Sequence, residues 1–313
     1  MQHYKASVLV NEKKIEFREL ELKAPLCNQV LVKVDSCAIC TLEQRIYSGS
    51  MKRYPFAGGH EVSGIVKSVG ESVKSIGCGE KVVIRLLNAC GECYYCRSGH
   101  ENQCETAFLA ATHDTLSGPG GLAEYLTVDA KNVYRVPDGI DLSHAALTEP
   151  LACCVHSVQK ADIRLGDDVV VIGIGIMGAL HIQLAKLRGA RVIACERDET
   201  RLDVARRMGA DVLIHSEDGI TVQTVLDMTE GRGADVVFCT AAAPAAAKES
   251  VEMAGKLGRV VLYSSFHPDE PISLNVNKVH STEVVITGAV NPDVRDFQTA
   301  CRLLASGLID VSQ

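Results

Sequence analysis

The sequence predicts an α/β fold, in which a β-rich region comes first and a doubly wound parallel sheet follows it. Short apolar or alternating segments, separated by glycine-containing turns, fill residues 1–140. From residue 168 onward, continuous apolar strands alternate with helical segments, which is typical of a parallel sheet. The first of these strands leads into a G-x-G-x-x-G run, the pattern of a dinucleotide-binding turn.

Length and composition indicate a globular protein of about two domains. The chain has 313 residues, of which 47% are hydrophobic and 23% charged, and its net charge is −7. This acidic balance indicates no basic face, so we do not expect nucleic acid as a partner. No segment reaches the about 18 consecutive apolar residues of a membrane span, and the N-terminus does not resemble a signal peptide. We therefore expect a cytoplasmic protein with no membrane partner.

The first region is expected to be antiparallel and barrel-like, with long loops between its strands. Its predicted strands are Ala6–Val10, Val30–Val34, Val62–Val69, Lys81–Leu86 and Ala123–Val128. A helix is predicted over 140–161, interrupted at Glu149-Pro150 because the residue before a proline avoids the helical conformation. Loops on a rigid strand framework often carry binding sites, so their polar residues are the first candidates.

Cys40, His60 and Glu61 form one candidate site near the ends of these strands. A thiolate, an imidazole and a carboxylate are ligands that Zn²⁺ accepts. Consecutive strand residues face opposite sides, so His60 and Glu61 can share a metal only where the backbone is irregular, as Gly58-Gly59 permits. The alternative is a buried thiol and a hydrogen-bonded core histidine. Glu149 is a further candidate, with a solvated surface glutamate as its alternative.

Four cysteines in one short loop form the most specific local motif. Cys90, Cys93, Cys96 and Cys104 follow the spacing C-x2-C-x2-C-x7-C. Four thiolates close a tetrahedral shell around Zn²⁺ and leave no open position, so we expect a structural site. An iron–sulfur run would have its fourth cysteine sooner and a proline after it, whereas Glu105 follows Cys104. Free or disulfide-paired cysteines are the remaining alternative.

The glycine run follows four consecutive β-branched residues, Val169–Ile172. Gly173, Gly175 and Gly178 allow a tight turn, close approach of a pyrophosphate and close packing of helix on strand. The next helix begins with unpaired N–H groups that suit the phosphates. Glu196 ends a second apolar strand, where a carboxylate can accept both ribose hydroxyls and repel a 2′-phosphate. The pattern favours NAD over NADP, and an ordinary βα turn is the alternative.

The alternation of strand and helix continues to the end of this region. Further strands are predicted at Val192–Cys195, Val212–Ile214, Val236–Cys239, Val260–Tyr263 and Val284–Thr287. Helices are predicted at Arg201–Met208, Ile220–Glu230 and Pro244–Lys256. Counting Val169–Ile172, this gives six strands, the number in two mononucleotide-binding halves.

In this combination and order, the motifs resemble the zinc-containing medium-chain dehydrogenases, particularly the polyol (sorbitol) and L-threonine 3-dehydrogenase branch. The resemblance covers essentially the whole chain. It implies a GroES-like catalytic domain over 1–150 with a structural zinc loop at 88–105, a Rossmann domain over 151–290, and an active site in the cleft between them. Residues 291–313 would begin a return to the catalytic domain. Relatives continue further, so we expect a truncated chain.

The resemblance also assigns residues. Cys40 and His60 match catalytic zinc ligands, and Glu61 matches the third ligand of this branch. Glu149 matches a carboxylate that ligates the metal directly or through water, so the choice of third ligand stays open. Glu43 matches an acid that partners the zinc-binding histidine. The cofactor positions of relatives match Gly173, Gly175, Met177, Gly178, Glu196, Arg201, Tyr263, Ser264, Ala289 and Val290.

Two positions depart from the family pattern. Relatives relay the substrate proton through a hydroxyl and an imidazole where this chain has Leu42 and Arg45. Thr41 provides a hydroxyl one position out of register, so either another group carries the proton or the activity is unusual.

The resemblance implies NAD-dependent oxidation of a secondary alcohol, in a polyol or an amino alcohol, to a ketone. It implies two zinc ions per chain, one for each ligand cluster, and a homodimer or homotetramer. The changes at Leu42 and Arg45 motivate a second hypothesis, a non-catalytic NAD(H)-binding protein that keeps the fold and the structural zinc. The sequence does not name the alcohol, because pocket residues in this architecture come from loops.

Overall fold

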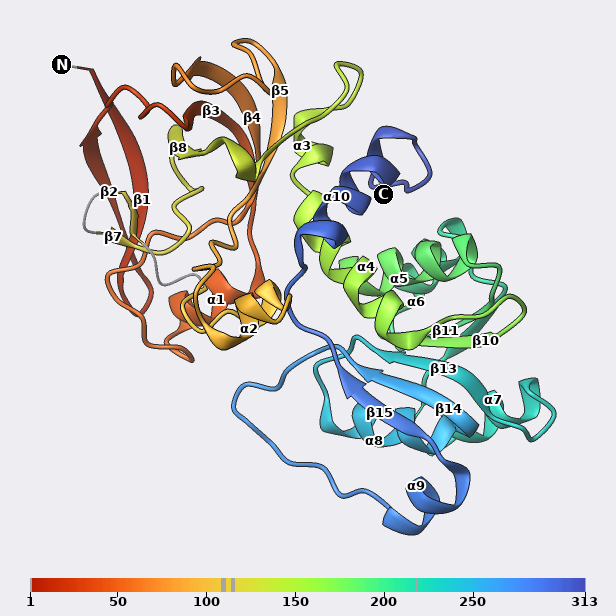
Figure 1. Cartoon of the computed structure of the whole chain (residues 1–313). Coiled ribbons are helices and arrows are strands. Elements are labelled where there is room, and N and C mark those ends of the chain that lie inside the picture. The colour runs from red at the N-terminus through yellow and green to blue at the C-terminus, as the bar shows by residue number, and fades with distance from the viewer. Residues whose placement is uncertain (1, 108–110, 114–115, 218, 313) are drawn as a thin grey trace. The chain divides into compact units, whose positions relative to one another are not determined.

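The computed structural model describes residues 2–107, 111–113, 116–217 and 219–312. These residues form two compact units, one from residues 2–152 and 291–312 and the other from residues 153–290 (Figure 1). None of the helices in the described ranges combines the length and the apolar run that crossing a bilayer requires.

The first unit is built on antiparallel strands, as predicted. A five-stranded sheet has the order β8-β3-β4-β5-β9, and β1 and β2 form a separate hairpin. The strands are β1 (His3–Asn11), β2 (Lys14–Glu21), β3 (Gln29–Ala38), β4 (Glu61–Val69), β5 (Lys81–Arg85), β6 (Ala111–His113), β7 (Leu116–Ser117), β8 (Tyr125–Asp129) and β9 (Val133–Arg135). Alternate residues of β3, such as Val30 and Val32, are fully buried against Ile84 and Leu126, and this core holds the site-bearing loops in place.

Short helices of the first unit follow these strands. They are α1 (Thr41–Ser48), α2 (Tyr94–Arg97), η1 (Glu101–Gln103), η2 (Ala130–Asn132), α3 (Leu142–Ala145) and α10 (Val294–Ala305). Helix α10 packs its buried Phe297 against the ring of Tyr134, with 4.9 Å between the ring centroids.

The predicted helix break at Glu149-Pro150 is wrong. Helix α4 runs from Thr148 to Ala161, and the interruption falls before it, after α3. Pro150 lies in the first turn of α4, where its missing N–H leaves no intrahelical hydrogen bond unmade. Glu149 therefore lies in the first turn of a helix and not at a bend.

The second unit contains the predicted six-stranded parallel sheet. Its order, β12-β11-β10-β13-β14-β15, is that of two mononucleotide-binding halves joined at β10 and β13, which confirms the predicted fold class. The strands are β10 (Asp168–Ile172), β11 (Arg191–Glu196), β12 (Val212–His215), β13 (Ala234–Cys239), β14 (Ala254–Leu262) and β15 (Val285–Gly288). All residues of β10 are buried, as expected for a central strand covered on both faces.

Helices cover both faces of this sheet (Figure 1). Together with α4, they are α5 (Ile176–Leu187), α6 (Glu199–Arg207), α7 (Thr221–Met228), α8 (Pro244–Met253) and α9 (Val276–Thr282). Helices α5 and α6 lie on one face, and α7 and α8 pack together on the other (Figure 1). Loops therefore follow the carboxyl ends of the strands, which is where open parallel sheets bind ligands.

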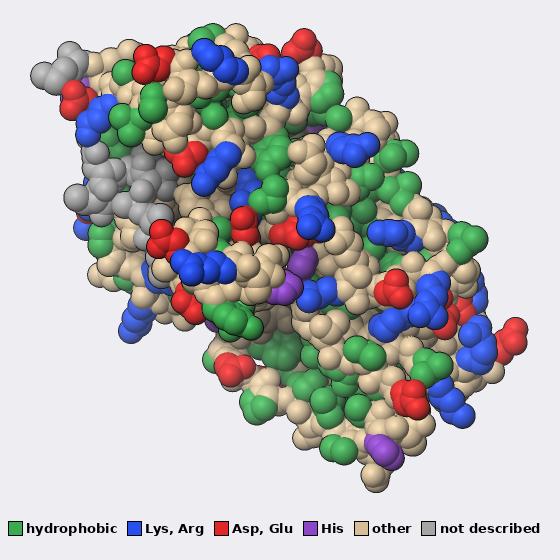
Figure 2. All heavy atoms as spheres, viewed as in Figure 1, with side chains coloured by type: hydrophobic (Ala, Val, Ile, Leu, Met, Phe, Trp, Pro, Cys, Tyr) green, Lys and Arg blue, Asp and Glu red, His purple; other side chains and the backbone are tan. Residues whose placement is uncertain are grey.

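Charged side chains of both signs lie on the surface (Figure 2). On the face that Figure 2 presents, acidic and basic side chains are interspersed.

Candidate active site

Glu43 joins the two chain segments that carry the predicted catalytic ligands. Its carboxylate accepts hydrogen bonds from the backbone N–H of Cys40 at 3.2 Å and of Gly59 at 2.9 Å. The same carboxylate lies 3.2 Å from Nδ1 of His60. The arrangement follows from helix capping, because Cys40 is the N-cap of α1 and Glu43 is its third residue. Because Nδ1 of His60 contacts Glu43, Nε2 is the nitrogen that would bind a metal.

Two glycines let the backbone before His60 pack closely against its neighbours. Gly59 has φ +94°, and a Cβ atom there would lie 2.5 Å from the backbone nitrogen of Leu122. A Cβ atom on Gly58 would lie 2.8 Å from Cγ of Glu43. His60 precedes β4, which begins at Glu61, so the irregular backbone required for two adjacent ligands is present.

The candidate ligands form two overlapping groups that share His60. Donor atoms of Cys40, Glu43 and His60 lie within 4.8 Å of one another, and so do those of His60, Glu61 and Glu149. Glu61 comes from the start of β4 and Glu149 from the first turn of α4. Sulfur, imidazole nitrogen and carboxylate oxygen gathered at one place form a donor set that fits Zn²⁺.

The electrostatics of this cluster suit a cation. Burial opposes protonation of His60, but the Cys40 thiol and the carboxylates of Glu43 and Glu149 hold the pKa of His60 well above its usual value. Burial and the nearby Glu149 raise the pKa of Glu61 to about 7. Carboxylates crowded together in a poorly solvated place repel one another, and a divalent ion bound among them would remove that repulsion.

The four cysteines of the second predicted metal site also come together. The Sγ atoms of Cys90, Cys93, Cys96 and Cys104 lie within 4.8 Å of one another, and those of Cys90 and Cys96 are 3.9 Å apart. A tetrahedral Zn²⁺ with Zn–S bonds of about 2.3 Å separates its sulfurs by about 3.8 Å. All thirteen cysteines of the chain are free thiols, so the disulfide alternative is not realised.

Backbone N–H groups support thiolates in this loop. The N–H of Cys90 donates to Sγ of Cys104 at 3.2 Å, and that of Cys93 donates to Sγ of Cys90 at 3.3 Å. Burial opposes ionisation of Cys104, but the N–H of Cys90 and the hydroxyl of Thr106 outweigh it and lower the pKa of this thiol to about 6. The loop therefore fits a structural zinc ion.

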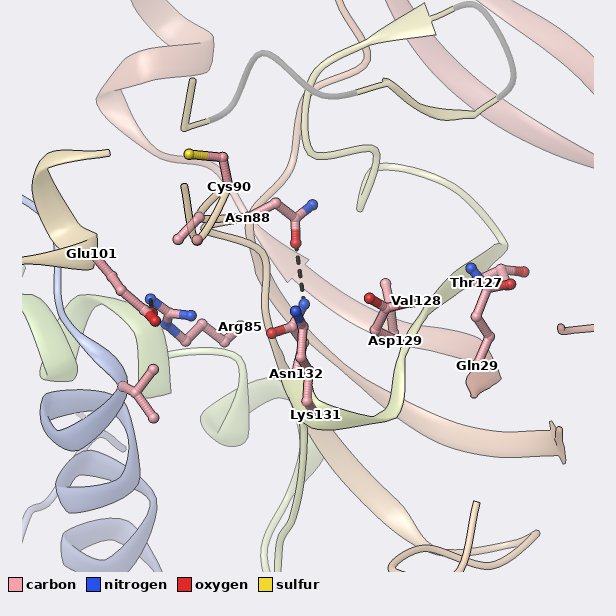
Figure 3. A pocket seen from close by; sticks show the side chains of 13 residues that line it. Gln29, Arg85, Asn88, Cys90, Glu101, Thr127, Val128, Asp129, Lys131 and Asn132 are labelled. Carbon is pink, nitrogen blue, oxygen red and sulfur yellow. Dashed lines mark hydrogen bonds and ion pairs between the residues drawn. The ribbon is translucent and has the colours of Figure 1, made fainter. Parts of the chain in front are cut away.

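A polar cavity of about 500 Å³ borders the four-cysteine loop (Figure 3). Its buried Arg85, at the end of β5, forms an ion pair with Glu101 of η1 at 3.2 Å. Asn132 donates to Asn88 at 3.1 Å across the same cavity. These bonds connect Glu101 to β5 and Asn88 to η2, and these two residues lie near the last and the first cysteine of the loop.

The three glycines of the cofactor motif have distinct surroundings. Gly173 has φ +88°, and a Cβ atom there would lie 2.9 Å from Ala241. A Cβ atom on Gly178 would lie 2.1 Å from the carbonyl oxygen of Gly173, whereas one on Gly175 would meet no atom within 4 Å. Gly175 is also the N-cap of α5, so open space surrounds the N–H groups that would face a pyrophosphate.

Glu196 also forms hydrogen bonds with the protein backbone, which the sequence did not predict. One of its carboxylate oxygens accepts from the N–H of Ile174 at 2.6 Å, and the other accepts from that of Arg197 at 2.7 Å. Arg201 lies 4.0 Å from the first oxygen. The oxygen that accepts from Arg197 also accepts from the N–H of Asp198 at 3.2 Å. The carboxylate therefore holds the glycine turn against the end of β11, and the oxygen bonded to Ile174 keeps a lone pair for a ribose hydroxyl.

Ser216 and Thr240 are pocket residues that sequence reasoning missed. They line a cavity of about 570 Å³ that also includes Gly173, Gly175 and Glu196. The buried hydroxyl of Ser216 has no hydrogen-bond partner within the described part of the chain, so the cavity suits a polar ligand. The Thr240 hydroxyl donates to the carbonyl of Ile172 at 3.0 Å. Both residues follow strands, β12 and β13, and position at a carboxyl strand end was the signal that could have found them.

The remaining predicted cofactor residues lie at other places along the same edge of the sheet. Met177 is in the first turn of α5, Tyr263 and Ser264 follow β14, and Ala289 and Val290 follow β15. The Ser264 hydroxyl donates to the carbonyl of Thr240 at 2.6 Å. None of these five lines the cavity described above.

Family models match both parts of the chain. The model for an alcohol dehydrogenase GroES-like domain matches residues 27–138, and the model for a zinc-binding dehydrogenase matches residues 173–306. The chain is 32% identical to 2-dehydro-3-deoxy-L-galactonate 5-dehydrogenase from Pseudoalteromonas atlantica, covering 98% of this chain and 89% of that protein. It is 33% identical to L-threonine 3-dehydrogenase from Bacillus subtilis, covering 91% and 82%.

Solved structures of dehydrogenases are also similar to this chain. A candidate zinc-binding dehydrogenase from Sinorhizobium meliloti, bound to NADP, superposes with a TM-score of 0.91 at 30% identity, covering 99% of this chain and 91% of that one. Galactitol-1-phosphate dehydrogenase from Escherichia coli gives a TM-score of 0.85 at 27% identity, covering 98% and 90%.

The chain therefore belongs to the zinc-binding alcohol dehydrogenase family, as predicted. It is an oxidoreductase that acts on alcohols with a nicotinamide cofactor. The hypothesis of a non-catalytic nucleotide-binding protein finds no support among these relatives.

Proposed function

We propose that this protein oxidises a secondary alcohol of a polyol, a sugar acid or an amino alcohol to the ketone, with NAD as hydride acceptor. The observation that carries the proposal is that His60 belongs to two groups of candidate ligands, one with Cys40 and Glu43 and one with Glu61 and Glu149, and that the donor atoms of each group lie within 4.8 Å of one another. The names of the relatives support the substrate class, because they act on a sugar acid and on threonine.

In this proposal Cys40 and His60 hold a zinc ion with Glu61 or Glu149 as the third ligand. A bound zinc ion supplies a Lewis acid for the substrate hydroxyl, and a bound NAD accepts hydride from the carbinol carbon. Glu43 orients His60 through Nδ1 and fixes Cys40 through its backbone N–H. Cys90, Cys93, Cys96 and Cys104 hold a second, structural zinc ion.

Thr41 is the group that we propose to move the substrate proton. Leu42 cannot do so, because a hydrocarbon side chain has no group that accepts or donates a proton, and it packs against the apolar cluster of Leu9, Ile46 and Phe56. The Thr41 hydroxyl lies 3.8 Å from Sγ of Cys40 and is exposed, so its oxygen can pass a proton from the site to solvent. Replacing Thr41 with valine should then slow turnover at low pH more than replacement with serine, which keeps the hydroxyl. Equal rates for the two variants would exclude Thr41 as the relay.

The position of Glu196 supports NAD over NADP, because a 2′-phosphate there would meet a carboxylate that is 9% exposed. Thermal unfolding with each cofactor at equal concentration tests this, since the cofactor that binds more tightly raises the midpoint further. A larger rise with NADP would contradict the preference.

The decisive experiment combines metal analysis with activity. We expect about two zinc ions per chain and NAD reduction with at least one member of a panel of sugar alcohols, sugar acids and hydroxy amino acids. A preparation with both zinc ions and bound NAD that is inactive on every member of the panel would contradict the proposed substrate class.

We further propose that the protein works in the cytoplasm as a homodimer or homotetramer. Thirteen free thiols suit a reducing compartment. Strand β15 is an edge of its sheet and exposes 54% of Val285, so this strand can pair with a second copy. Light scattering of the eluting protein measures the assembly directly, and a monomer would contradict the proposal.

A further inference from the structure

His181 is a fully buried imidazole on α5 whose two nitrogens both have partners. Nδ1 lies 2.7 Å from the carbonyl oxygen of Met177, and Nε2 lies 2.8 Å from the hydroxyl of Ser157 on α4. A carbonyl can only accept, so Nδ1 carries the proton and Nε2 accepts from Ser157. The bonds therefore define one tautomer and one ring orientation.

The faces and edges of this ring contact the second half of the parallel sheet. The centroid of the His181 ring lies 4.6 Å from that of Phe238 on β13 and 4.9 Å from that of Tyr263, which follows β14. The Tyr263 contact is edge-on, with 76° between the rings. His181 thus connects the first turn of α5, the helix α4 and the carboxyl ends of two strands.

These neighbours belong to the cofactor site that the resemblance assigns. Met177 and Tyr263 are two of its predicted residues, and neither lines the cavity that contains Glu196 and Ser216. In a sheet of two mononucleotide-binding halves, β10–β12 serve one nucleotide and β13–β15 the other. Glu196 ends β11, which places the adenosine half of NAD there, so Tyr263 falls on the nicotinamide half.

We infer that His181 is a positioning residue, which together with Ser157 holds Met177 and Tyr263 in place for the nicotinamide half of the cofactor. The inference rests on the proposed use of NAD. A ring with no exposed surface acts through the groups that it contacts, which here include Ser157, Met177 and Tyr263. A leucine would fill the same space but would leave the Ser157 hydroxyl buried without its acceptor.

The experiment compares NAD with ADP-ribose, which lacks the nicotinamide ring, by calorimetric titration of the full chain. In the Ser157→Ala and His181→Phe variants we expect the Kd of NAD to rise about 3- to 10-fold, which is the effect of one lost buried hydrogen bond. The Kd of ADP-ribose should change less than about twofold. Ser250→Ala is the matched control, because Ser250 is a buried helical serine whose hydroxyl bonds only within α8, to Ala247.

The double variant adds a second criterion. If Ser157 and His181 act through their mutual hydrogen bond, the double variant should bind NAD no more weakly than the weaker single variant. Equal changes in the two Kd values, or no change in either, would overturn the inference and leave a purely structural contact. Wild-type protein that binds ADP-ribose but not NAD, or binds neither, would instead contradict the proposed function.

Discussion

Burial of His181 makes the stability of the protein depend on pH in a calculable way. Burial, opposed by the hydrogen bond to the Met177 carbonyl, lowers the pKa of His181 from 6.5 to about 4. His181 therefore becomes protonated below about pH 6.5 in the unfolded chain but only below about pH 4 in the folded protein. Stability from this residue is fully present above pH 6.5 and falls as the pH decreases through that window.

The size of the effect follows from the shift. A difference of one pKa unit corresponds to about 1.4 kcal/mol, so between pH 7 and pH 5 His181 should remove about 2 kcal/mol from the free energy of unfolding. In a His181→Phe variant this dependence is absent. The difference in free energy of unfolding between wild type and variant should thus decrease by about 2 kcal/mol over that range.

Urea unfolding of both proteins from pH 5 to pH 7, with saturating zinc, measures this difference. Other titrating groups, including the metal ligands, occur in both proteins and cancel in the comparison. A difference that stays constant with pH would refute the reasoning, because it would mean that the folded protein protonates His181 as easily as the unfolded chain does. Ser250→Ala again serves as a control with no change in titratable groups.

Three further predictions concern the motifs. Gly178→Ala should destabilise the ligand-free protein by about 3 kcal/mol, because the new Cβ would lie 2.1 Å from a backbone oxygen. Gly175→Ala should leave the urea midpoint nearly unchanged and weaken NAD binding, because a Cβ there meets no atom within 4 Å. Equal urea midpoints for the two variants would contradict this prediction. Cys104→Ser should reduce the zinc content from about two ions to about one and lower the thermal midpoint, and an unchanged content would exclude the loop as a zinc site. Glu43→Gln should weaken binding of the catalytic zinc about 10- to 100-fold, measured by competition with a chelator, and unchanged affinity would show that His60 needs no carboxylate partner.

The parallel sheet could be predicted from the sequence because each of its strands contains a short apolar run. Val169–Ile172 is buried on both faces, so its composition alone marks it as a central strand. Strand β2 (Lys14–Glu21) was not predicted, since only its alternate residues are partly covered and it is rich in charge. Helix α9 was missed for a related reason, as none of its residues is buried.

The prediction of a helix break failed because proline is compatible with two positions, the residue after a helix break and the first turn of a new helix. Proline disfavours a helical conformation in the residue before it, and this rule placed a break at Glu149-Pro150. Proline is also well tolerated in a first helical turn, and this is the position that the fold uses. Deciding between the two requires knowing where the preceding helix ends, which depends on packing and not on the dipeptide.

The two predicted zinc sites show how far local sequence can predict function. Cys90 to Cys104 lie within one loop, so their spacing alone restricts how the sulfurs can meet, and a single motif suffices. The catalytic cluster comes from three segments around positions 40, 60 and 149, none of which is informative alone. They meet because Glu43 bonds both Cys40 and Gly59 and because two glycines permit close approach. Glu43 could be assigned from the family resemblance as a partner of His60, but its bonds to the backbone of Cys40 and Gly59 could be seen only in the fold.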